Sequence, residues 1–294
     1  MENLLTATNL AKSYGTTRAL QSCSLHIPQG AVYALVGADG AGKSTMLKVL
    51  SGREKPLTGS CIFSGALTGI RRVKKEGIGY VPAFPCYKGR KTCREVLSGA
   101  RRIPAEKVTE VLEIAELGKE ADMQAAYLSA GAQIRLEAAR ELLADPKLLL
   151  VDEPFRGLCA ADRRSLQLFF LKLQTSYGIT LMLTCSSANE PGDLPTHYGF
   201  LKNGRLLGEY TAQTIHSSAL LRVSSAQRAS ELLEGHVKTL TESDDLLRIF
   251  GAEDLTAIAA SLGEAGICIL PPYGDFRLHP SVTSGKGALT WAVC

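Results

Sequence analysis

The sequence has no apolar run that approaches the length of a membrane span, and its N-terminus, MENLLTATNL, has no basic segment followed by an apolar one. No run of lysine and arginine exceeds two residues and the formal net charge is only +4, so nucleic acid is not the expected partner. The eight cysteines form no C-x-x-C pair, which argues against zinc and for reduced thiols. These absences predict a cytosolic chain.

A phosphate-binding loop is the most informative motif that is present. The stretch GADGAGKST at 37–45 matches the pattern G-x-x-x-x-G-K-[ST], in which backbone N–H groups surround a phosphate at the start of a helix. In this pattern Lys43 reaches the outer phosphates and Ser44 holds Mg²⁺. The predicted nucleotide contacts of the loop are Gly37, Ala38, Asp39, Gly40, Ala41, Gly42, Lys43, Ser44 and Thr45.

The sequence on either side of this loop supports nucleotide binding. AVYALVG reads as a buried strand that ends at Gly37, and TMLKVLSG reads as a helix that stops at Gly52. The alternative is a glycine-rich turn that binds no nucleotide. The order of strand, loop and helix, which the phosphate-binding motif requires, disfavours that alternative.

A second motif, which is acidic, follows another buried strand. KLLLVDEP at 147–154 runs from four apolar residues into two carboxylates, as expected of a parallel strand that delivers acids to its carboxyl end. Asp152 is predicted to orient Mg²⁺ and Glu153 to polarise the attacking water, and phosphoryl transfer needs both positions filled. A solvated strand end is the alternative interpretation. Lys43 and Glu153 are therefore the predicted catalytic residues, and Ser44 and Asp152 the predicted metal ligands.

The other segments outline an α/β domain. Residues 3–27 predict two antiparallel strands joined by a turn at 15–18, and Tyr14 before that turn is either a half-buried strand residue or a ring that can stack on a base. Further strands are predicted within 52–64 and up to Val81, with a basic turn between them. From 82 to about 145 the pattern is helical, with Ser129 as an N-cap and Gly118 as a C-cap.

With these elements in order, residues 2 to about 210 resemble the ATP-binding subunits of ABC transporters. Tyr14 resembles the adenine-stacking aromatic of that family, 37–45 its Walker A loop and LLLVDEP its Walker B strand. LSAGA at 128–132 stands where the family has its LSGGQ signature. That signature begins a helix facing the γ-phosphate held by the opposite subunit, so the resemblance implies that Ser129 and Gly131 act in trans.

The chain departs from the family pattern at four places. Ala83 follows the strand IGYVP where the family usually has a glutamine, and Ala130 and Ala132 alter the signature. The loop after the Walker B strand reads RGLC at 156–159 where the family has SGLD, so Cys159 replaces an aspartate. The family's switch histidine is also missing.

Cys185 or Ser186 occupies the place of that histidine, depending on the alignment, and His197 lies too far along the chain to substitute for it. Mg·ATP binding is expected to survive these changes, while hydrolysis is expected to be slow, since loss of one positioned hydrogen-bonding group commonly costs on the order of a hundredfold in rate. In combining intact ATP binding with impaired hydrolysis, the chain resembles the impaired member of a heteromeric transporter ATPase.

The length of 294 residues is sufficient for a domain of about 200 residues and a smaller one. We expect an α/β P-loop domain of the ABC type at 1–210, with a helical subdomain at about 83–145. An α+β domain at 211–294, in the order strand, helix, two strands, helix, strand, resembles the extension found on drug-export and antibiotic-resistance ABC ATPases. In that domain Asp244, Asp245, Glu253 and Asp254 are interpreted as a turn and a helix cap.

The family implies ATP and Mg²⁺ as ligands, membrane-spanning subunits and a second ATPase subunit as partners, and a position on the inner face of the cell membrane. The expected function is ATP-driven transport, in the export direction. The alternative is a non-hydrolysing regulatory or structural subunit that binds ATP beside a competent ATPase.

Overall fold

The computed structural model describes residues 2–64, 66–67, 77–87, 89–99, 103–252 and 255–270. The chain divides into two compact units, Met1–Glu209 and Tyr210–Cys294. Most of the predicted basic turn, the acidic residues Glu253 and Asp254, and the chain after residue 270 lie outside the described residues. The two units are described separately below.

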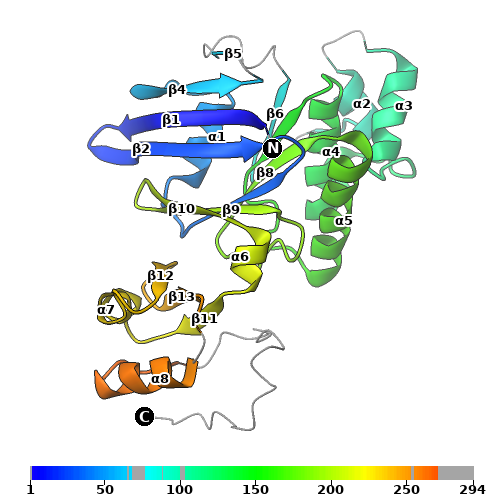
Figure 1. Cartoon of the computed structure of the whole chain (residues 1–294). Helices are drawn as coiled ribbons and strands as arrows, with labels where there is room; N and C mark the ends of the chain where they lie inside the picture. The colour runs from blue at the N-terminus through cyan, green and yellow to red at the C-terminus, as the bar shows by residue number, and fades with distance from the viewer. Residues whose placement is uncertain are drawn as a thin grey trace. The chain divides into compact units, whose positions relative to one another are not determined.

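The first unit is built on a six-stranded sheet with the strand order β10-β9-β3-β8-β7-β6 (Figure 1). Neighbouring strands from β9 to β6 pair in parallel, so their carboxyl ends lie at one edge. The strands are β3 (Val32–Val36), β6 (Ile78–Val81), β7 (Leu148–Val151), β8 (Thr180–Cys185), β9 (His197–Lys202) and β10 (Arg205–Thr211). This edge receives both the loop that follows β3 and the acidic residues that follow β7.

A four-stranded antiparallel sheet accompanies the parallel one, with the order β2-β1-β4-β5. The predicted hairpin is confirmed, because β1 and β2 pair from the turn at Tyr14 and Thr17 back to Asn3 and Pro28. The strands of this sheet are β1 (Asn3–Tyr14), β2 (Thr17–Pro28), β4 (Thr58–Phe63) and β5 (Ala66–Leu67).

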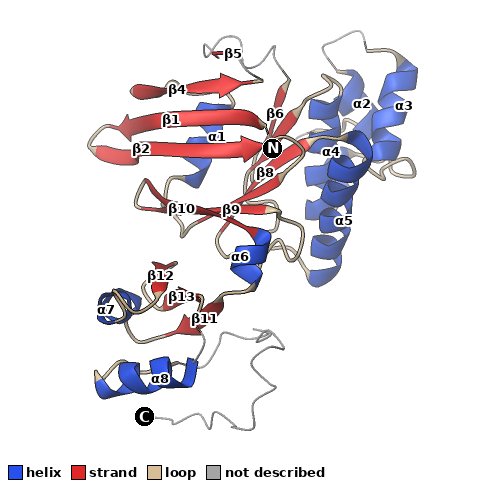
Figure 2. Ribbon diagram, viewed as in Figure 1, coloured by secondary structure: helices blue, strands red, loops and turns tan. Residues whose placement is uncertain are grey.

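Helices pack on both faces of the parallel sheet, and α2, α3, α4 and α5 gather on one side of it (Figure 2). Along β7, Leu149 and Val151 join the core under those helices, while Leu148 and Leu150 join the core shared with α1 and the antiparallel sheet. The helices are α1 (Lys43–Leu50), α2 (Cys93–Ser98), α3 (Ala105–Ile114), α4 (Ala130–Leu142), α5 (Ala160–Tyr177) and the short 3₁₀ turn Ala125–Tyr127.

The predicted helix caps have different outcomes. Ser129 caps α4, since its side chain accepts a hydrogen bond from the backbone of Ala132. The prediction of Gly118 as the cap of α3 is wrong, because Glu116 takes the left-handed conformation instead, with φ of 57°. The N–H of Leu117 donates to the carbonyl of Leu112 at 2.8 Å, which closes a Schellman motif around buried apolar side chains without a glycine.

The second unit contains a three-stranded sheet in the order β11-β13-β12, with both neighbouring pairs antiparallel. The predicted turn lies between β12 and β13, where Asp245 accepts a hydrogen bond from Arg222 at 2.9 Å. The predicted last strand is represented within the described residues by the single bridge between Val223 and Ile269. The elements are β11 (Ala219–Arg222), β12 (Lys238–Thr241), β13 (Leu246–Phe250), α6 (Ala212–His216), α7 (Ala226–Leu232) and α8 (Leu255–Glu264).

Candidate functional site

The candidate site lies at the carboxyl edge of the parallel sheet, where the segments after β3, β7 and β8 meet. Val36 pairs with Cys185, so β3 and β8 end in register, and Val151 pairs with Leu183, so β7 ends two residues before them at the same edge. The N–H of Gly37 donates to the carbonyl of Cys185 at 3.1 Å. The strand order therefore brings the loop 37–45 beside the two carboxylates after β7.

Two glycines of the loop are required by the backbone itself. Gly42, which precedes α1, has φ of 106°, a conformation that side chains with a Cβ rarely adopt. A Cβ at this position would collide with the backbone oxygen of Ala19, and one at Gly37 would collide with the backbone oxygen of Leu201. The loop thus has a backbone path that turns closely past β2 and β9.

Lys43 is buried inside this loop, with only 3% of its surface exposed. Its Nζ donates to the carbonyl of Gly37 at 2.5 Å and to that of Ala38 at 3.1 Å, and it forms an ion pair with Glu153 Oε1 at 3.1 Å. These contacts use the three donors of the ammonium group. The structure therefore brings together the two residues that the sequence predicts as catalytic, one from each motif.

Polar oxygens cluster beside them around Asp152. Asp152 Oδ1 accepts hydrogen bonds from Ser44 Oγ at 3.1 Å and from Thr184 Oγ1 at 2.7 Å, and Tyr80 donates to Oδ2 at 3.4 Å. Thr184 Oγ1 also accepts from the N–H of Glu153 at 2.7 Å. Oxygen atoms of this kind, next to a phosphate-binding loop, are the ligands that Mg²⁺ prefers. Ser44 and Asp152 therefore fit the predicted metal site.

Glu153 is held in an unusual backbone conformation, with φ of 42°. Left-handed backbone at a residue other than glycine is uncommon and collects at functional sites. Burial raises the pKa of Glu153, but the hydrogen bonds from Arg156 and Lys43 outweigh burial and bring the pKa below its ordinary value. The side chain is therefore a carboxylate, which can accept a hydrogen bond from water.

Arg156 and Thr184 are site residues that were not predicted from the sequence. Arg156 Nη1 lies 2.6 Å from Glu153 Oε2, and its Nη2 lies 2.9 Å from Asp39 Oδ2. The signal for Arg156 was its place in RGLC, three residues after the glutamate. For Thr184 the signal was a hydroxyl near the end of an otherwise apolar strand.

Tyr14 lies at the side of the phosphate-binding loop. Its hydroxyl donates to Glu54 Oε2 at 2.6 Å and also bonds with the side chain of Thr45, while Lys12 Nζ lies 5.2 Å from the ring centroid. The ring is partly exposed, and its predicted role of stacking on a base stays a prediction.

The two signature residues lie apart from this cluster, at the start of α4. Ser129 Oγ donates to Asp162 Oδ1 at 3.2 Å, and Asp162 side-chain atoms are also the nearest neighbours of Gly131 where a Cβ would stand. No hydrogen bond that we find among the described residues connects either of them with the loop 37–45. Their action on a nucleotide in trans stays a prediction.

The structure also locates the departures from the family pattern. Ala83 follows β6 at the same edge of the sheet, whereas His197 begins β9 and pairs with Tyr33 in the amino-terminal part of β3. The prediction that His197 cannot replace the switch histidine is consistent with this position. Cys185 is buried at the end of β8 and Ser186 is exposed after it, so only Ser186 has an exposed side chain.

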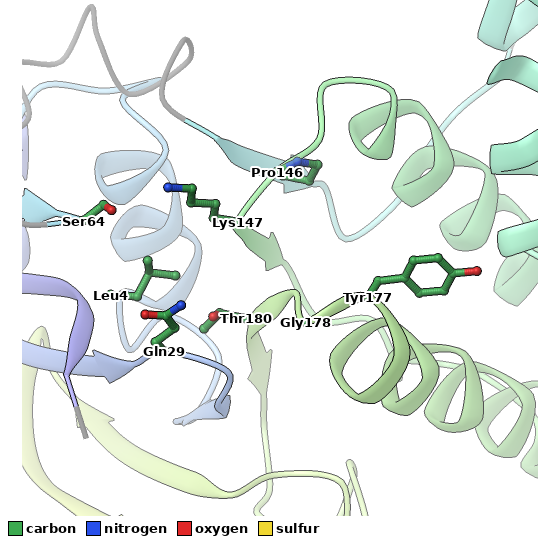
Figure 3. Close-up of a pocket in the computed structure, with 8 residues that line it drawn as sticks. All are labelled: Leu4, Gln29, Ser64, Pro146, Lys147, Tyr177, Gly178 and Thr180. Carbon is green, nitrogen blue, oxygen red and sulfur yellow. The ribbon is translucent and has the colours of Figure 1, made fainter.

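A cavity of about 210 Å³ in the first unit lies away from these residues (Figure 3). Thr180 begins β8 and Lys147 precedes β7, so the cavity lies at the amino ends of the strands, opposite the phosphate-binding loop. Its lining includes none of the predicted site residues and consists of Leu4, Gln29, Ser64, Pro146, Lys147, Tyr177, Gly178 and Thr180.

Comparison with known proteins gives one consistent result. The family model described as "ABC transporter" matches residues 20–156. The sulfate/thiosulfate import ATP-binding protein CysA of Bacillus cereus is 32% identical over 221 residues, which cover 71% of this chain and 62% of that protein. The CysA protein of Thermosynechococcus vestitus is 30% identical over 209 residues, covering 69% of this chain and 62% of the relative. The chain thus spans about three fifths of the length of these relatives.

Solved structures agree with the predicted fold class. An ATP-binding cassette of an ABC transporter in its ADP conformation aligns with a TM-score of 0.67 at 23% identity, covering 72% of this chain and 92% of that chain. A dimeric cassette in a post-hydrolysis state, bound to ADP and Pi, aligns with a TM-score of 0.60 at 25% identity, covering 70% of this chain and 98% of the other. The α/β P-loop fold is confirmed.

Proposed function

We propose that the chain, whose residues 20–156 match the ABC transporter family model, binds Mg·ATP and hydrolyses it to drive transport by separate membrane-spanning subunits. The observation that carries the proposal is the contact between Lys43 and Glu153, at 3.1 Å, beside the pair Ser44 and Asp152. One cation, one base and two metal ligands in a single cluster are the parts that phosphoryl transfer requires.

ATP binding begins with an exchange of partners at Lys43. The backbone N–H groups of 38–45 and the start of α1 provide donors for the phosphate oxygens. Because all three donors of Lys43 already have acceptors, a phosphate oxygen must replace at least one of them. The carboxylate of Glu153 is the acceptor that can move, since the other two are carbonyls of the loop itself.

Ser44 and Asp152 would hold Mg²⁺. When bound, this ion neutralises charge on the phosphate oxygens. Thr184 and Tyr80 support the arrangement from the protein side, since both donate to Asp152 and limit the rotation of its carboxylate.

Hydrolysis uses Glu153 to orient a water molecule. A water oxygen adds to the γ-phosphorus while the bond from that phosphorus to the bridging oxygen breaks, and ADP leaves with the electron pair. The water proton passes to Glu153 or to a phosphate oxygen, giving ADP and inorganic phosphate. Because Ala83 has no hydrogen-bonding side chain and the switch histidine of the family is missing, the isolated chain is expected to turn over slowly.

Membrane-spanning subunits and a second ATPase subunit are the proposed partners, which places the working complex on the inner face of the cell membrane. No helix among the described residues is long and apolar enough to cross a membrane. The segment after Pro82 carries two highly exposed aromatic side chains, Phe84 at 70% and Tyr127 at 75%. Exposed aromatics are enriched at protein interfaces, which supports docking through this region.

The direction of transport is part of the proposal. Both CysA relatives are named as import proteins, so their names favour import, and the expectation of a drug-export type finds no support in them. Neither of them is named as a non-hydrolysing regulatory subunit, and we do not propose that alternative.

The composition of the ATP-trapped complex tests this function. Glu153→Gln protein, purified in Mg·ATP with the products of its neighbouring genes, should be found by mass measurement with membrane subunits and a second, different ATPase chain. A different partner is expected because Ala130 adds a methyl group to the signature, where the backbone must approach phosphate closely. A stable homodimer alone would refute the heteromeric pairing, and the absence of any ATP-dependent assembly would refute the transporter role.

A further inference from the structure

Arg156 connects the phosphate-binding loop with the carboxylates that follow β7. It lies in the segment between β7 and α5, three residues after Glu153, where the family has a serine. Its guanidinium contacts Glu153 on one side and Asp39 of the phosphate-binding loop on the other. The arginine thus ties the carboxylate to the loop that would hold the nucleotide.

The geometry of these contacts is specific. Nη1 lies 3.3 Å from Asp39 Oδ1 and Nη2 lies 2.9 Å from Asp39 Oδ2, so the guanidinium meets that carboxylate with two parallel hydrogen bonds. Nη1 also lies 2.6 Å from Glu153 Oε2. Lysine cannot reproduce a fork that reaches both carboxylates at once.

The contact with Glu153 matters more than the contact with Asp39. The Asp39 side chain is 64% exposed and that of Arg156 is 47% exposed, and ion pairs between exposed groups contribute little. The Glu153 side chain is only 9% exposed, and a buried carboxylate that loses its partner is strongly disfavoured. Asp39 therefore orients the guanidinium, and Glu153 is the group on which it acts.

Arg156 becomes more important when a phosphate binds. Glu153 has two cationic partners, Lys43 at Oε1 and Arg156 at Oε2, and a phosphate competes for Lys43. Once Lys43 turns to the phosphate, Arg156 is the cation in the described site that still holds Glu153.

We propose that Arg156 is a positioning residue that holds the Glu153 carboxylate against the phosphate-binding loop while Lys43 binds the phosphates of ATP. This role rests on the proposed hydrolysis. It predicts an effect on the rate of the chemical step and little effect on ATP affinity. Arg156 contacts the side-chain carboxylates of Glu153 and Asp39, whereas the loop is predicted to bind phosphate through its backbone N–H groups and Lys43.

The test compares Arg156→Ala, Arg156→Lys and wild-type full-length chain in single-turnover hydrolysis of saturating Mg·ATP, with the dissociation constant measured by calorimetry. Misplacing a catalytic group costs up to about a hundredfold in rate. We expect Arg156→Ala to lose about tenfold to a hundredfold in rate, Arg156→Lys to lose less, and both to bind Mg·ATP within about threefold of wild type. Arg164→Ala, at an exposed position of α5, is the matched control for lost charge and should stay within about twofold.

A double variant distinguishes the proposed positioning role of Arg156 from a merely structural role. If Arg156 acts through Glu153, adding Arg156→Ala to Glu153→Gln should leave the residual rate unchanged within about twofold. The proposal would be overturned by a further large loss of rate in the double variant, or by an unchanged or faster rate in Arg156→Ala alone. It would also be overturned if Arg156→Ala lost more than tenfold in ATP affinity while its rate at saturating ATP stayed unchanged. A wild-type rate equal to that of Glu153→Gln would overturn it as well. In that case, Mg·ATP binding by the wild type and not by Lys43→Ala would show that the proposed ATP-binding function still holds.

Discussion

Replacing Lys43 by Ala is expected to weaken Mg·ATP binding by at least about thirtyfold, because truncating one partner of a buried charged contact typically costs about 2 to 5 kcal/mol. Lys43 is the buried cation of the loop, and its Nζ lies 2.5 Å from the carbonyl of Gly37, where the backbone turns toward the predicted phosphate position. Isothermal titration calorimetry of wild-type and variant chains measures the change directly.

Lys48 provides the matched control for this substitution. It lies on the same helix, in the last turn of α1 and away from the phosphate-binding loop. Lys48→Ala removes the same charge and should change the dissociation constant by less than about threefold. An affinity of Lys43→Ala equal to that of wild type would remove the basis for assigning ATP to this loop.

Replacing Glu153 by Gln is expected to lower ATP turnover by about a hundredfold to ten-thousandfold, the range usual for a lost general base. The variant keeps the shape of the side chain but loses the negative charge that orients water. Binding of Mg·ATP should be kept or improved, since the amide no longer pairs as a carboxylate with Lys43, which becomes available to a phosphate. Turnover and calorimetry on the same preparations separate the two effects.

The wild-type rate is part of this prediction. We expect the purified chain to turn over below about 1 per second, the lower end of the typical enzyme range, because Ala83 and Ser186 leave Glu153 without its usual supports. A rate well inside the typical range, lost in Glu153→Gln, would show that these departures matter less than we infer. Equal rates in wild type and variant would show that Glu153 is not the base.

The site motifs were predictable because their signals are local. The loop 37–45 needs a strand before it and a helix after it, and the sequence carries both within a few residues. Asp152 and Glu153 follow an apolar strand directly, so their place at the sheet edge follows from strand direction alone. Their contact with Lys43 and Ser44 also depends on the strand order, in which β8 alone separates β3 from β7.

The missed features depend on tertiary contacts. Arg156 became recognisable as a site residue through its contacts with Glu153 and with Asp39, which lies 117 positions away in the chain. Thr184 has the pattern of an ordinary strand residue, and its role comes from facing Asp152 on a strand paired with β7. At the end of α3, a buried Leu117 stabilised a left-handed Glu116, so packing outweighed the preference for glycine.

The most direct test of the central claim is a crystal structure of Glu153→Gln chain grown with Mg·ATP. The account predicts the β- and γ-phosphates on the N–H groups of 38–45 and on Lys43 Nζ, with Mg²⁺ beside Ser44 and Asp152. Nucleotide bound elsewhere, for example in the cavity beside Tyr177, or a phosphate-binding loop that stays empty at saturating Mg·ATP, would contradict it.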